Sequence, residues 1–527
     1  MMIMCIRKGW DALSHKDVRM RDGLFFLMAV SMLFLTLPKF ARVPFIGGPF
    51  SPMLLCWPFL LAALHSIACE RRTHDVFVHG KLFVGWVLLY CGVQIVSLVH
   101  GMAIFPYTDE VLAGPVAQID SITMVTAWAE RLGVEAPKVL LLRIWMVVSP
   151  LKNLLLNTLY PFGLAYLVYC WYRRDPAQGL RVLCRGAAVG MAIIALFSLV
   201  EIPYLLGNET AKWLLTLVTP FLHSIKEANG WWPPLLWPYR ARAMFAEPSY
   251  LGIYFGWAMP LFFLFCLRVK TLRTRVACGV VLFLCGMELF ATFSRTAMGL
   301  LLMVVAIFLA GVWLARRTLA VRRALAIVLT VVAAYAGVIY CCQLAMGTEG
   351  VETSQAYMEE TVGKAAAGTT GSSRTRYGVI GAELRMGRDH FLLGVGPQLQ
   401  RAYILDYLDE SDIEASVEMQ MWIKQKKATG RMSQQVPDLC EYPHLFAETG
   451  AVGLFVYLLP TFFLLYAIFR RLWLERCTCV TTLLLLASFL TTIVSATLSA
   501  PLLHNPAHFL LLGFIFAYVR KKEIYEQ

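Results

Sequence analysis

Charged residues are scarce in this sequence. Only 15% of the 527 residues are Asp, Glu, Lys or Arg, whereas 58% are hydrophobic and the mean hydropathy is +0.63. This composition excludes an ordinary soluble domain. The 14 cysteines include no Cys-x-x-Cys pair, and no set of Cys and His residues has the sequence spacing of metal ligands, so neither a redox motif nor a zinc module is expected. Internal repeats and low-complexity tracts are also absent.

Long apolar runs dominate the chain instead. Each is long enough to cross the roughly 30 Å of hydrocarbon in a bilayer. The first run, from Leu24, is followed by Pro38 and Lys39 and not by a small-residue cleavage site, so we interpret it as a membrane span. Hydropathy predicts an all-α polytopic membrane protein with about 12 transmembrane helices, at 23–38, 50–69, 82–105, 152–172, 183–206, 249–267, 276–293, 297–314, 323–342, 450–469, 479–498 and 503–519.

The basic residues indicate the orientation of these spans. The formal net charge of +13 is compatible with nucleic-acid binding, but the basic residues form short clusters between apolar runs, so no nucleic acid is expected as a partner. With the N-terminus inside, the inner segments hold 26 basic and nine acidic residues, a net charge of +17, and the rest of the chain carries −4. The positive-inside rule therefore places both termini in the cytoplasm.

Three outer intervals are long: 106–151, 207–248 and 343–449. The first contains an amphipathic piece near Lys138–Val148, which we expect at the membrane interface. The second is rich in tryptophan, and an interfacial aromatic belt is the simplest interpretation. The third, whose part 403–435 reads as a helix or a mobile lid, is predicted to be a large helical periplasmic loop. The chain thus divides into spans 1–9 at 1–342, the loop at 343–449, and spans 10–12 with the tail at 450–527.

The first candidate site lies where the second outer interval enters the sixth span. Arg240 and Arg242 stand two residues apart, and Glu247 with Pro248 follows. Charges and a proline break are costly beside lipid, so these residues are expected to face protein or water. Guanidinium groups suit phosphate oxygens, because they offer paired donors. The alternative is that both arginines extend to lipid headgroups.

The second candidate site is a very short outer turn, Thr292-Phe-Ser-Arg-Thr296. Arg295 would lie near membrane depth, where a cation is rarely accidental. The alternative is purely structural, with Ser294 capping the next helix and Arg295 reaching to the headgroups.

The third candidate site is in the large loop. Arg374 and Arg376 follow two serines that suit the start of a helix, so both would meet an anionic group there. Gly394 and Gly396, in Gly-Val-Gly-Pro, predict a sharp turn with exposed backbone donors.

His444 and Glu448 end the loop, four residues apart, and would share one face of a helix. A histidine at the mouth of a membrane cavity can accept a proton near neutral pH, although a lone histidine is more often structural.

These motifs, in this order, resemble the O-antigen ligase and polymerase family of bacterial envelope glycan assembly. The stretch from Arg240 is similar to the family's Arg-x-x-Gly-x-Phe-x-x-Pro motif, with Ala243 where glycine is common and with a Glu-Pro-Ser variant that we associate with exopolysaccharide-type members. The Ser294–Arg295 pair, the Gly-Val-Gly-Pro turn, the histidine and a final Glu-Thr-Gly also match. The chain departs by having Leu445 after the histidine, where the family often has Asn, and by a shorter interval to Glu-Thr-Gly.

The resemblance implies a GT-C-type glycosyltransferase that needs no metal or cofactor and acts at the periplasmic face of the bacterial inner membrane. Its donor would be an undecaprenyl-diphosphate-linked glycan, and its acceptor a second lipid-linked repeat or the lipid A core. The five arginines would bind the diphosphate, and His444, or Glu448, would be the base. We favour a polymerase over a ligase. A lipid-linked-glycan flippase, and a GT-C transferase with Asp109 or Glu110 as base, remain alternatives.

The charge distribution predicts opposite sides for two parts of the chain. A reporter fused after Arg322 should report the cytoplasm, and one fused within 403–435 should report the periplasm, because the first lies in a basic segment and the second in the acidic remainder. Alkaline phosphatase and green fluorescent protein fusions, compared at both positions, measure this. The same side for both fusions would contradict the topology.

Overall fold

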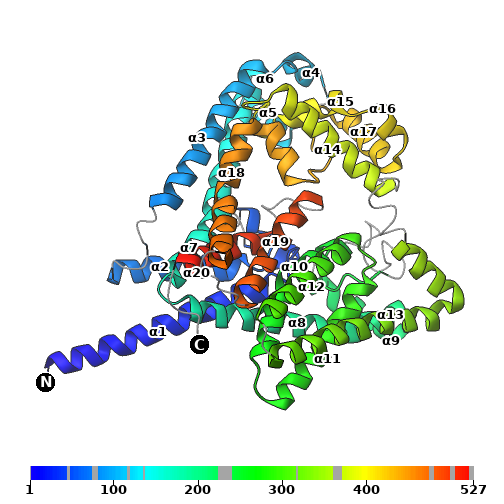
Figure 1. The fold of residues 1–527 in the computed structure, drawn as a ribbon. Coiled ribbons are helices and arrows are strands. Elements are labelled where there is room, and N and C mark those ends of the chain that lie inside the picture. The colour runs from blue at the N-terminus through cyan, green and yellow to red at the C-terminus, as the bar shows by residue number, and fades with distance from the viewer. Residues whose placement is uncertain are drawn as a thin grey trace.

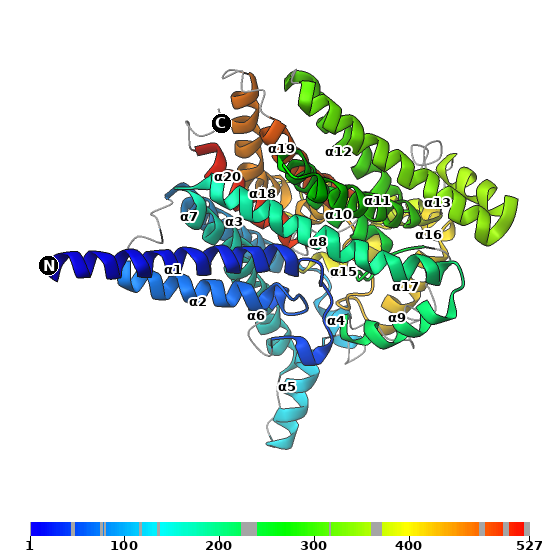
Figure 2. The same cartoon turned by 90° about the horizontal axis from the view of Figure 1, so that it is seen from below.

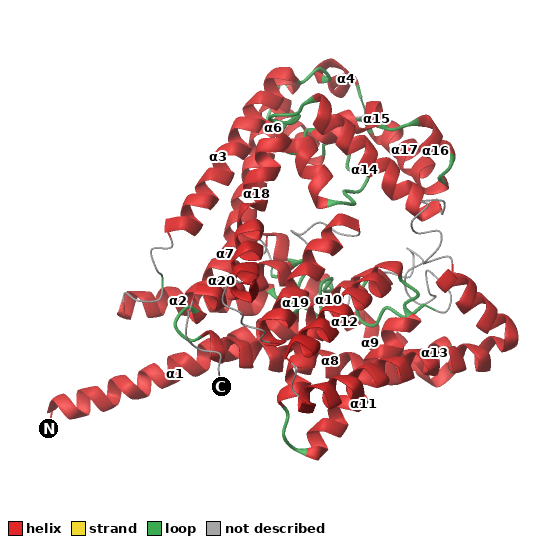
Figure 3. Ribbon diagram, in the orientation of Figure 1, coloured by secondary structure: helices red, strands yellow, loops and turns green. Residues whose placement is uncertain are grey.

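The computed structural model describes residues 2–43, 48–73, 77, 81–114, 119–133, 137–222, 240–315, 318–359, 371–473, 480–498 and 505–520. Over these residues the chain is helical and has no strand, which confirms the all-α class (Figure 3). Trp231, Trp232 and Trp237 of the predicted aromatic belt lie outside the described residues.

The helices have the following bounds. Those of the first half are α1 (Met2–Ser31), η1 (Lys39–Ala41), η2 (Gly48–Phe50), α2 (Cys56–Thr73), α3 (Lys81–Ile104), α4 (Thr108–Ala113), α5 (Asp120–Arg131), α6 (Lys138–Asn157), η4 (Thr158–Phe162), α7 (Gly163–Tyr172), α8 (Pro176–Leu205) and α9 (Glu209–Leu222). Those of the second half are α10 (Pro248–Arg268), α11 (Leu272–Ala291), α12 (Arg295–Ala315), α13 (Thr318–Glu359), α14 (Gly371–Asp389), α15 (Gln400–Tyr407), α16 (Glu410–Glu414), α17 (Val417–Thr429), α18 (Glu441–Trp473), α19 (Val480–Leu498) and α20 (Pro506–Arg520).

All twelve predicted spans overlap helices, but the number twelve is not confirmed. Among the described residues, nine helical stretches are long and apolar enough to cross a membrane. The helices α1 and α2 are not among these nine, and α20 has only 15 residues. The chain is therefore polytopic, with nine spans supported by length and composition.

One helix begins earlier than the predicted span. The piece at Lys138–Val148, expected at the membrane interface, is the first part of one continuous helical stretch, Lys138–Tyr172, which also contains the predicted span 152–172. A π-helical turn, η4, joins α6 to α7 and contains Pro161. Proline lacks the N–H that an α-helix would use, and the wider turn lets the helix continue past it. The face of α6 with Leu142 and Met146 is buried, which holds this part against protein.

The helices form two regions, which Figure 1 shows. The helices α14–α17 gather with α4 and α5 at the top, and α8–α13, α19 and α20 form the body below. Both α3 and α18 run between the two regions. Seen from below, α1 and α2 lie side by side and α5 projects outward (Figure 2).

The upper region has its own hydrophobic core, to which α14 and α17 contribute. Val379 and Met386 from α14 pack there with Met419 and Ile423 from α17, and all four are buried. Ser416 caps α17 by accepting a hydrogen bond from the N–H of Met419 at 3.2 Å. Part 403–435 is thus a set of packed helices with a core, which favours the helical reading over a mobile lid.

The helix α18, which runs between the two regions, is broken at Gly450. Gly450 has φ 64° and ψ −169°, which only glycine adopts without strain, so α18 consists of two helices. A Cβ at Gly450 would overlap the backbone of Leu392, and one at Gly394 would overlap the backbone of Glu448. The break falls where hydropathy began the tenth span, at residue 450, so the outer part of α18 belongs to the upper region.

Candidate functional site

The first two candidate sites form a single structure. The Arg240 side chain donates from Nε to the carbonyl of Thr292 and from Nη2 to that of Phe293, each at 2.8 Å. The N–H of Ala241 donates to the carbonyl of Ala291, also at 2.8 Å. Arg240 therefore holds the short turn between α11 and α12, in addition to any contact with a substrate.

The joined loop and turn contain two unusual backbone conformations. Ala243 has φ 48° and Phe293 has φ 44°, which place both in the left-handed region that side chains with a Cβ rarely adopt. The family motif that this stretch resembles commonly has glycine at position 243, and the positive φ explains that preference. Left-handed residues of this kind cluster at functional sites, where surrounding contacts hold them.

The turn leads directly into α12 and Arg295. The Oγ of Ser294 accepts from the N–H of Ala297 at 3.4 Å, and the Ser294 N–H donates to the Thr292 hydroxyl at 3.1 Å. Ser294 thus caps α12, as the structural alternative predicted. Arg295 is the first residue of α12 and is half-buried.

Arg242 is more deeply buried than the sequence suggested. Its side chain is 5% exposed, and Nη1 lies 3.4 Å from the carbonyl oxygen of Ala246. Burial lowers the pKa of Arg242, and the nearby Glu201 carboxylate acts in the opposite direction. Glu247 precedes Pro248, the first residue of α10, and its carboxylate accepts from the Ser249 hydroxyl at 3.2 Å.

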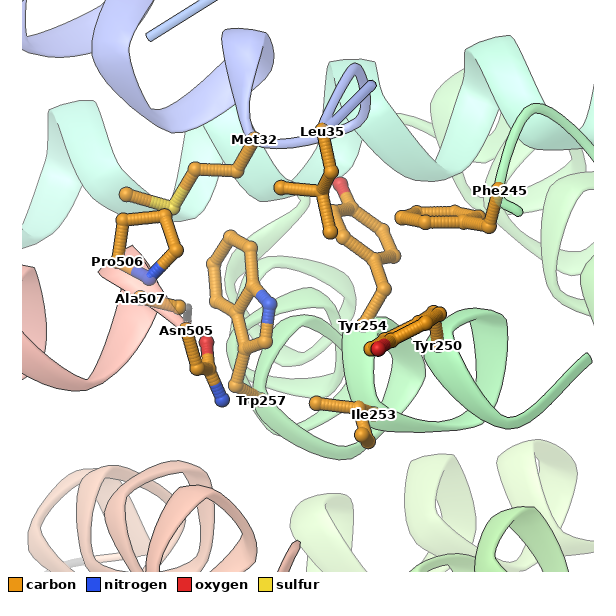
Figure 4. A pocket seen from close by; sticks show the side chains of 10 residues that line it. All are labelled: Met32, Leu35, Phe245, Tyr250, Ile253, Tyr254, Trp257, Asn505, Pro506 and Ala507. Carbon is orange, nitrogen blue, oxygen red and sulfur yellow. The ribbon is translucent and has the colours of Figure 1, made fainter. Parts of the chain in front are cut away.

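A small pocket lies beside the start of α10 (Figure 4). The rings of Tyr250, Tyr254 and Trp257 from α10 face Met32 and Leu35, which follow the end of α1. The volume is about 20 Å³, room for about one water molecule. The walls of the pocket are largely apolar, and Phe245 of the arginine-bearing loop is one of the lining residues.

The arginines of α14 differ in exposure. Arg374 is exposed and Arg376 half-buried. Burial raises the pKa of Glu418 on α17, the positive charge of Arg376 lowers it, and the Glu247 carboxylate raises it. Arg376 and Glu247 therefore share one electrostatic environment, although they are 129 positions apart. This brings the third candidate site toward the first.

The Gly-Val-Gly-Pro turn does not expose its backbone donors, contrary to the prediction. The N–H groups of Val395 and Gly396 donate to the carbonyls of Ala447 and Glu448, each at 2.9 Å. Both Gly394 and Gly396 are buried with positive φ, because the turn packs into the break of α18. The turn positions the histidine segment and presents no anion-binding amides.

His444 and Glu448 share one helix face, as predicted. The Nε2 atom of His444 lies 3.5 Å from Oε1 of Glu448. That oxygen also accepts the backbone N–H of Gln398 at 2.5 Å. Glu448 is thus held between the turn and the imidazole.

Two carboxylates beside His444 were missed by sequence analysis. The Nδ1 atom lies 3.3 Å from Oε1 of Glu383 on α14 and 3.4 Å from Oδ1 of Asp438. Glu383 is 2% exposed, and burial raises its pKa to about 7 against the lowering effect of His444. Glu383 lies 61 positions from His444, so only the fold brings it there.

Two groups of described side chains have the arrangement of metal ligands. Glu383, Asp438 and His444 offer three ligand atoms within 4.8 Å of one another, and so do Asp17, His65 and Cys69 on α1 and α2. Carboxylate, imidazole and thiolate are ligands that Zn²⁺ accepts. The expectation of no metal was based on sequence spacing, which does not detect such groups.

Glu110, the base in one alternative, is engaged elsewhere. Arg431 donates from Nε to Oε1 of Glu110 at 2.6 Å and from Nη1 to Asp406 at 2.8 Å. Its guanidinium carbon also lies 4.3 Å from the ring centroid of Tyr107. This network fastens α4 to α15 and gives Glu110 a structural partner.

The helices and the composition define an all-α polytopic membrane protein. Residues 279–418 match the family described as O-antigen ligase. The match confirms the resemblance to the O-antigen ligase and polymerase family, whose members are glycan-transferring enzymes. The matched segment contains Arg295, Arg374 and Arg376, whereas Arg240 and His444 lie outside it. No curated protein matches the chain.

The contacts of Arg240 generate a mutational prediction. We expect Arg240→Lys and Arg295→Lys to lose at least about 90% of glycan transfer, because hydrogen bonds to a charged group contribute about 1.5–3 kcal/mol and lysine lacks the planar fork. Transfer is measured in membranes with matched amounts of folded protein. Arg388→Lys is the control, since Arg388 is exposed and its Nε lies 3.3 Å from a carboxylate oxygen of the neighbouring Asp389. Activity near wild type in both variants would reject the arginine site.

Proposed function

We propose that this enzyme transfers a glycan from undecaprenyl diphosphate to an acceptor sugar hydroxyl at the periplasmic face of the inner membrane. The observation that carries the proposal is the joining of Arg240 to the Ser294–Arg295 turn, inside and beside the segment that matches the O-antigen ligase family. The charge distribution supports a periplasmic site, since both stretches lie on predicted outer segments.

The arginines would stabilise the leaving diphosphate. The acceptor oxygen attacks the anomeric carbon, the bond from that carbon to the diphosphate breaks, and undecaprenyl diphosphate departs with the electron pair. Arg295, Arg374 and Arg376, which are half-buried or exposed, would contact it. Arg240 keeps the turn in place, Arg242 lies 3.4 Å from the carbonyl oxygen of Ala246 in its own loop, and both add positive potential. Fixed cations of this kind act where negative charge develops.

His444 is the proposed base. The proton of the acceptor hydroxyl passes to its imidazole as the new glycosidic bond forms. Against the lowering effect of burial, carboxylates on both sides, Glu383 and Asp438 at Nδ1 and Glu448 at Nε2, raise the pKa of His444 well above its ordinary value. The imidazole must therefore first pass a proton from Nδ1 to Glu383, whose pKa of about 7 suits it as the acceptor, before it can take the proton of the hydroxyl. The helices α15, α16 and α17 pack against α14, the helix that carries Glu383.

Metal independence is part of the proposal and can be tested directly. If Glu383, Asp438 and His444 held a divalent ion, His444 would not be available as a base. We expect transfer in washed membranes to continue in EDTA at the wild-type rate, because the arginines supply the positive charge. If transfer is lost in EDTA and restored by Zn²⁺, Mn²⁺ or Mg²⁺, these three residues form a metal centre and His444 is not the base.

Three activities are compatible with a lipid-linked glycan as the substrate. We favour a polymerase, of the GT-C type, because the Glu247-Pro248-Ser249 variant resembles exopolysaccharide-type members and because α15–α17 enlarge the outer region for two bulky lipid-linked chains. A ligase would join one such chain to the lipid A core, and the matched family is described as a ligase. A flippase is the third reading, although charges near the midplane, typical of transporters, do not characterise the candidate site.

Deleting the gene decides among them. A polymerase predicts that the long-chain glycan ladder disappears from gels while single repeats still reach the final acceptor. Full-length polymer accumulating on undecaprenyl diphosphate, with a bare acceptor, would show a ligase. Repeats trapped on the inner leaflet would show a flippase. Complementation with the wild-type gene is the control.

A further inference from the structure

Two buried carboxyl groups, Glu201 and Glu288, have no role in the proposed reaction. Both lie near the ends of helices, Glu201 on α8 and Glu288 on α11, and they are 3% and 0% exposed. Burying a charged group without partners is costly. The partners of Glu201 therefore indicate what it does.

The Glu201 carboxylate binds the backbone of the arginine-bearing loop. Its Oε1 accepts the N–H of Arg242 at 3.2 Å, and its Oε2 accepts the N–H of Ala243 at 2.7 Å. Each oxygen thus serves one of two successive amides. Charge-assisted bonds of this kind are stronger than neutral ones. Ala243 is the residue with φ 48°, so the carboxylate holds the loop at its strained position.

The same carboxylate also affects the buried guanidinium. Glu201 counteracts the lowering of the Arg242 pKa by burial, so it compensates this cation electrostatically. One residue before, Ala241 is bonded to the carbonyl of Ala291, and Arg240 is bonded to the next two carbonyls. The loop is therefore fixed on one side by α8 and on the other by the end of α11.

We propose that Glu201 is a positioning residue that sets the 240–243 loop and, through Arg240, the turn that carries Arg295. The inference rests on the proposed function for its substrate, the diphosphate of the donor lipid. Glu201 does not contact this group. It acts by fixing two backbone amides, which keeps Arg240 on the turn and thereby orients Arg295 toward the diphosphate.

The test compares Glu201→Gln and Glu201→Asp with a matched control, Glu209→Gln. Gln replaces one acceptor oxygen by an NH₂ donor, which faces an N–H group and cannot bond to it. Asp keeps both oxygens on a shorter side chain. Glu209 lies on the adjacent α9, and its carboxylate is 80% exposed. All proteins are purified in detergent and checked for folding by size-exclusion chromatography.

Two readouts are used. Hydrogen–deuterium exchange of the peptide covering 240–247, without any ligand, measures how well the loop backbone is protected. Native mass spectrometry measures the affinity for undecaprenyl diphosphate. We expect Glu201→Gln to speed exchange in this peptide and to weaken binding about tenfold, as loss of one such hydrogen bond would. Glu201→Asp should recover part of both losses, and Glu209→Gln should change neither.

The outcomes separate the inference from the function. Unchanged exchange in folded Glu201→Gln overturns the inference, whatever the protein binds. Faster exchange with unchanged binding also overturns it, because the loop would then not position the diphosphate site. If wild-type protein fails to bind undecaprenyl diphosphate, the proposed function fails and the positioning role for that ligand fails with it, while the exchange data still decide whether Glu201 holds the loop.

Discussion

The break in α18 at Gly450 is the constraint on which the histidine site depends. A continuous helix would carry His444 on the same rigid rod as the membrane span. Instead, the Gly-Val-Gly-Pro turn enters the break and binds the carbonyls of Ala447 and Glu448 with its own amides. Carbonyls at a helix end need such partners. The outer part of α18 is thus attached to α14, and this attachment brings Glu383 to His444.

The charges of the candidate site are divided by sign. Acidic groups surround His444, whereas arginines occupy the 240–243 loop, the start of α12 and the N-terminal part of α14. This division suits the proposed chemistry, because the base must accept a proton while the leaving group gains negative charge. Glu247 and Arg376 both affect the pKa of Glu418, in opposite directions, which relates the 240–247 loop to α14 and α17.

Sequence patterns predicted those features that depend on local composition. Hydropathy located helices for every predicted span, and the i, i+4 spacing placed His444 beside Glu448. Pairings between distant segments could not be predicted: nothing local connects Glu383 to His444 or Glu201 to Ala243. The role of the Gly-Val-Gly-Pro turn was misassigned for the same reason. A glycine turn predicts unpaired amides, but whether a ligand or another helix binds them depends on tertiary packing.

The strained loop explains why charged residues are buried at this site. Left-handed backbone at Ala243 and Phe293 costs about 1–3 kcal/mol each. Arg240 makes two charge-assisted hydrogen bonds near Phe293, and Glu201 makes two at Arg242 and Ala243, each worth about 1.5–3 kcal/mol. At each of the two residues the pair of hydrogen bonds contributes about 3–6 kcal/mol, which exceeds the strain and can hold the left-handed backbone in place. Glycine, common in the family at position 243, would remove much of the strain. With alanine there, the conformation of this chain depends more strongly on Glu201.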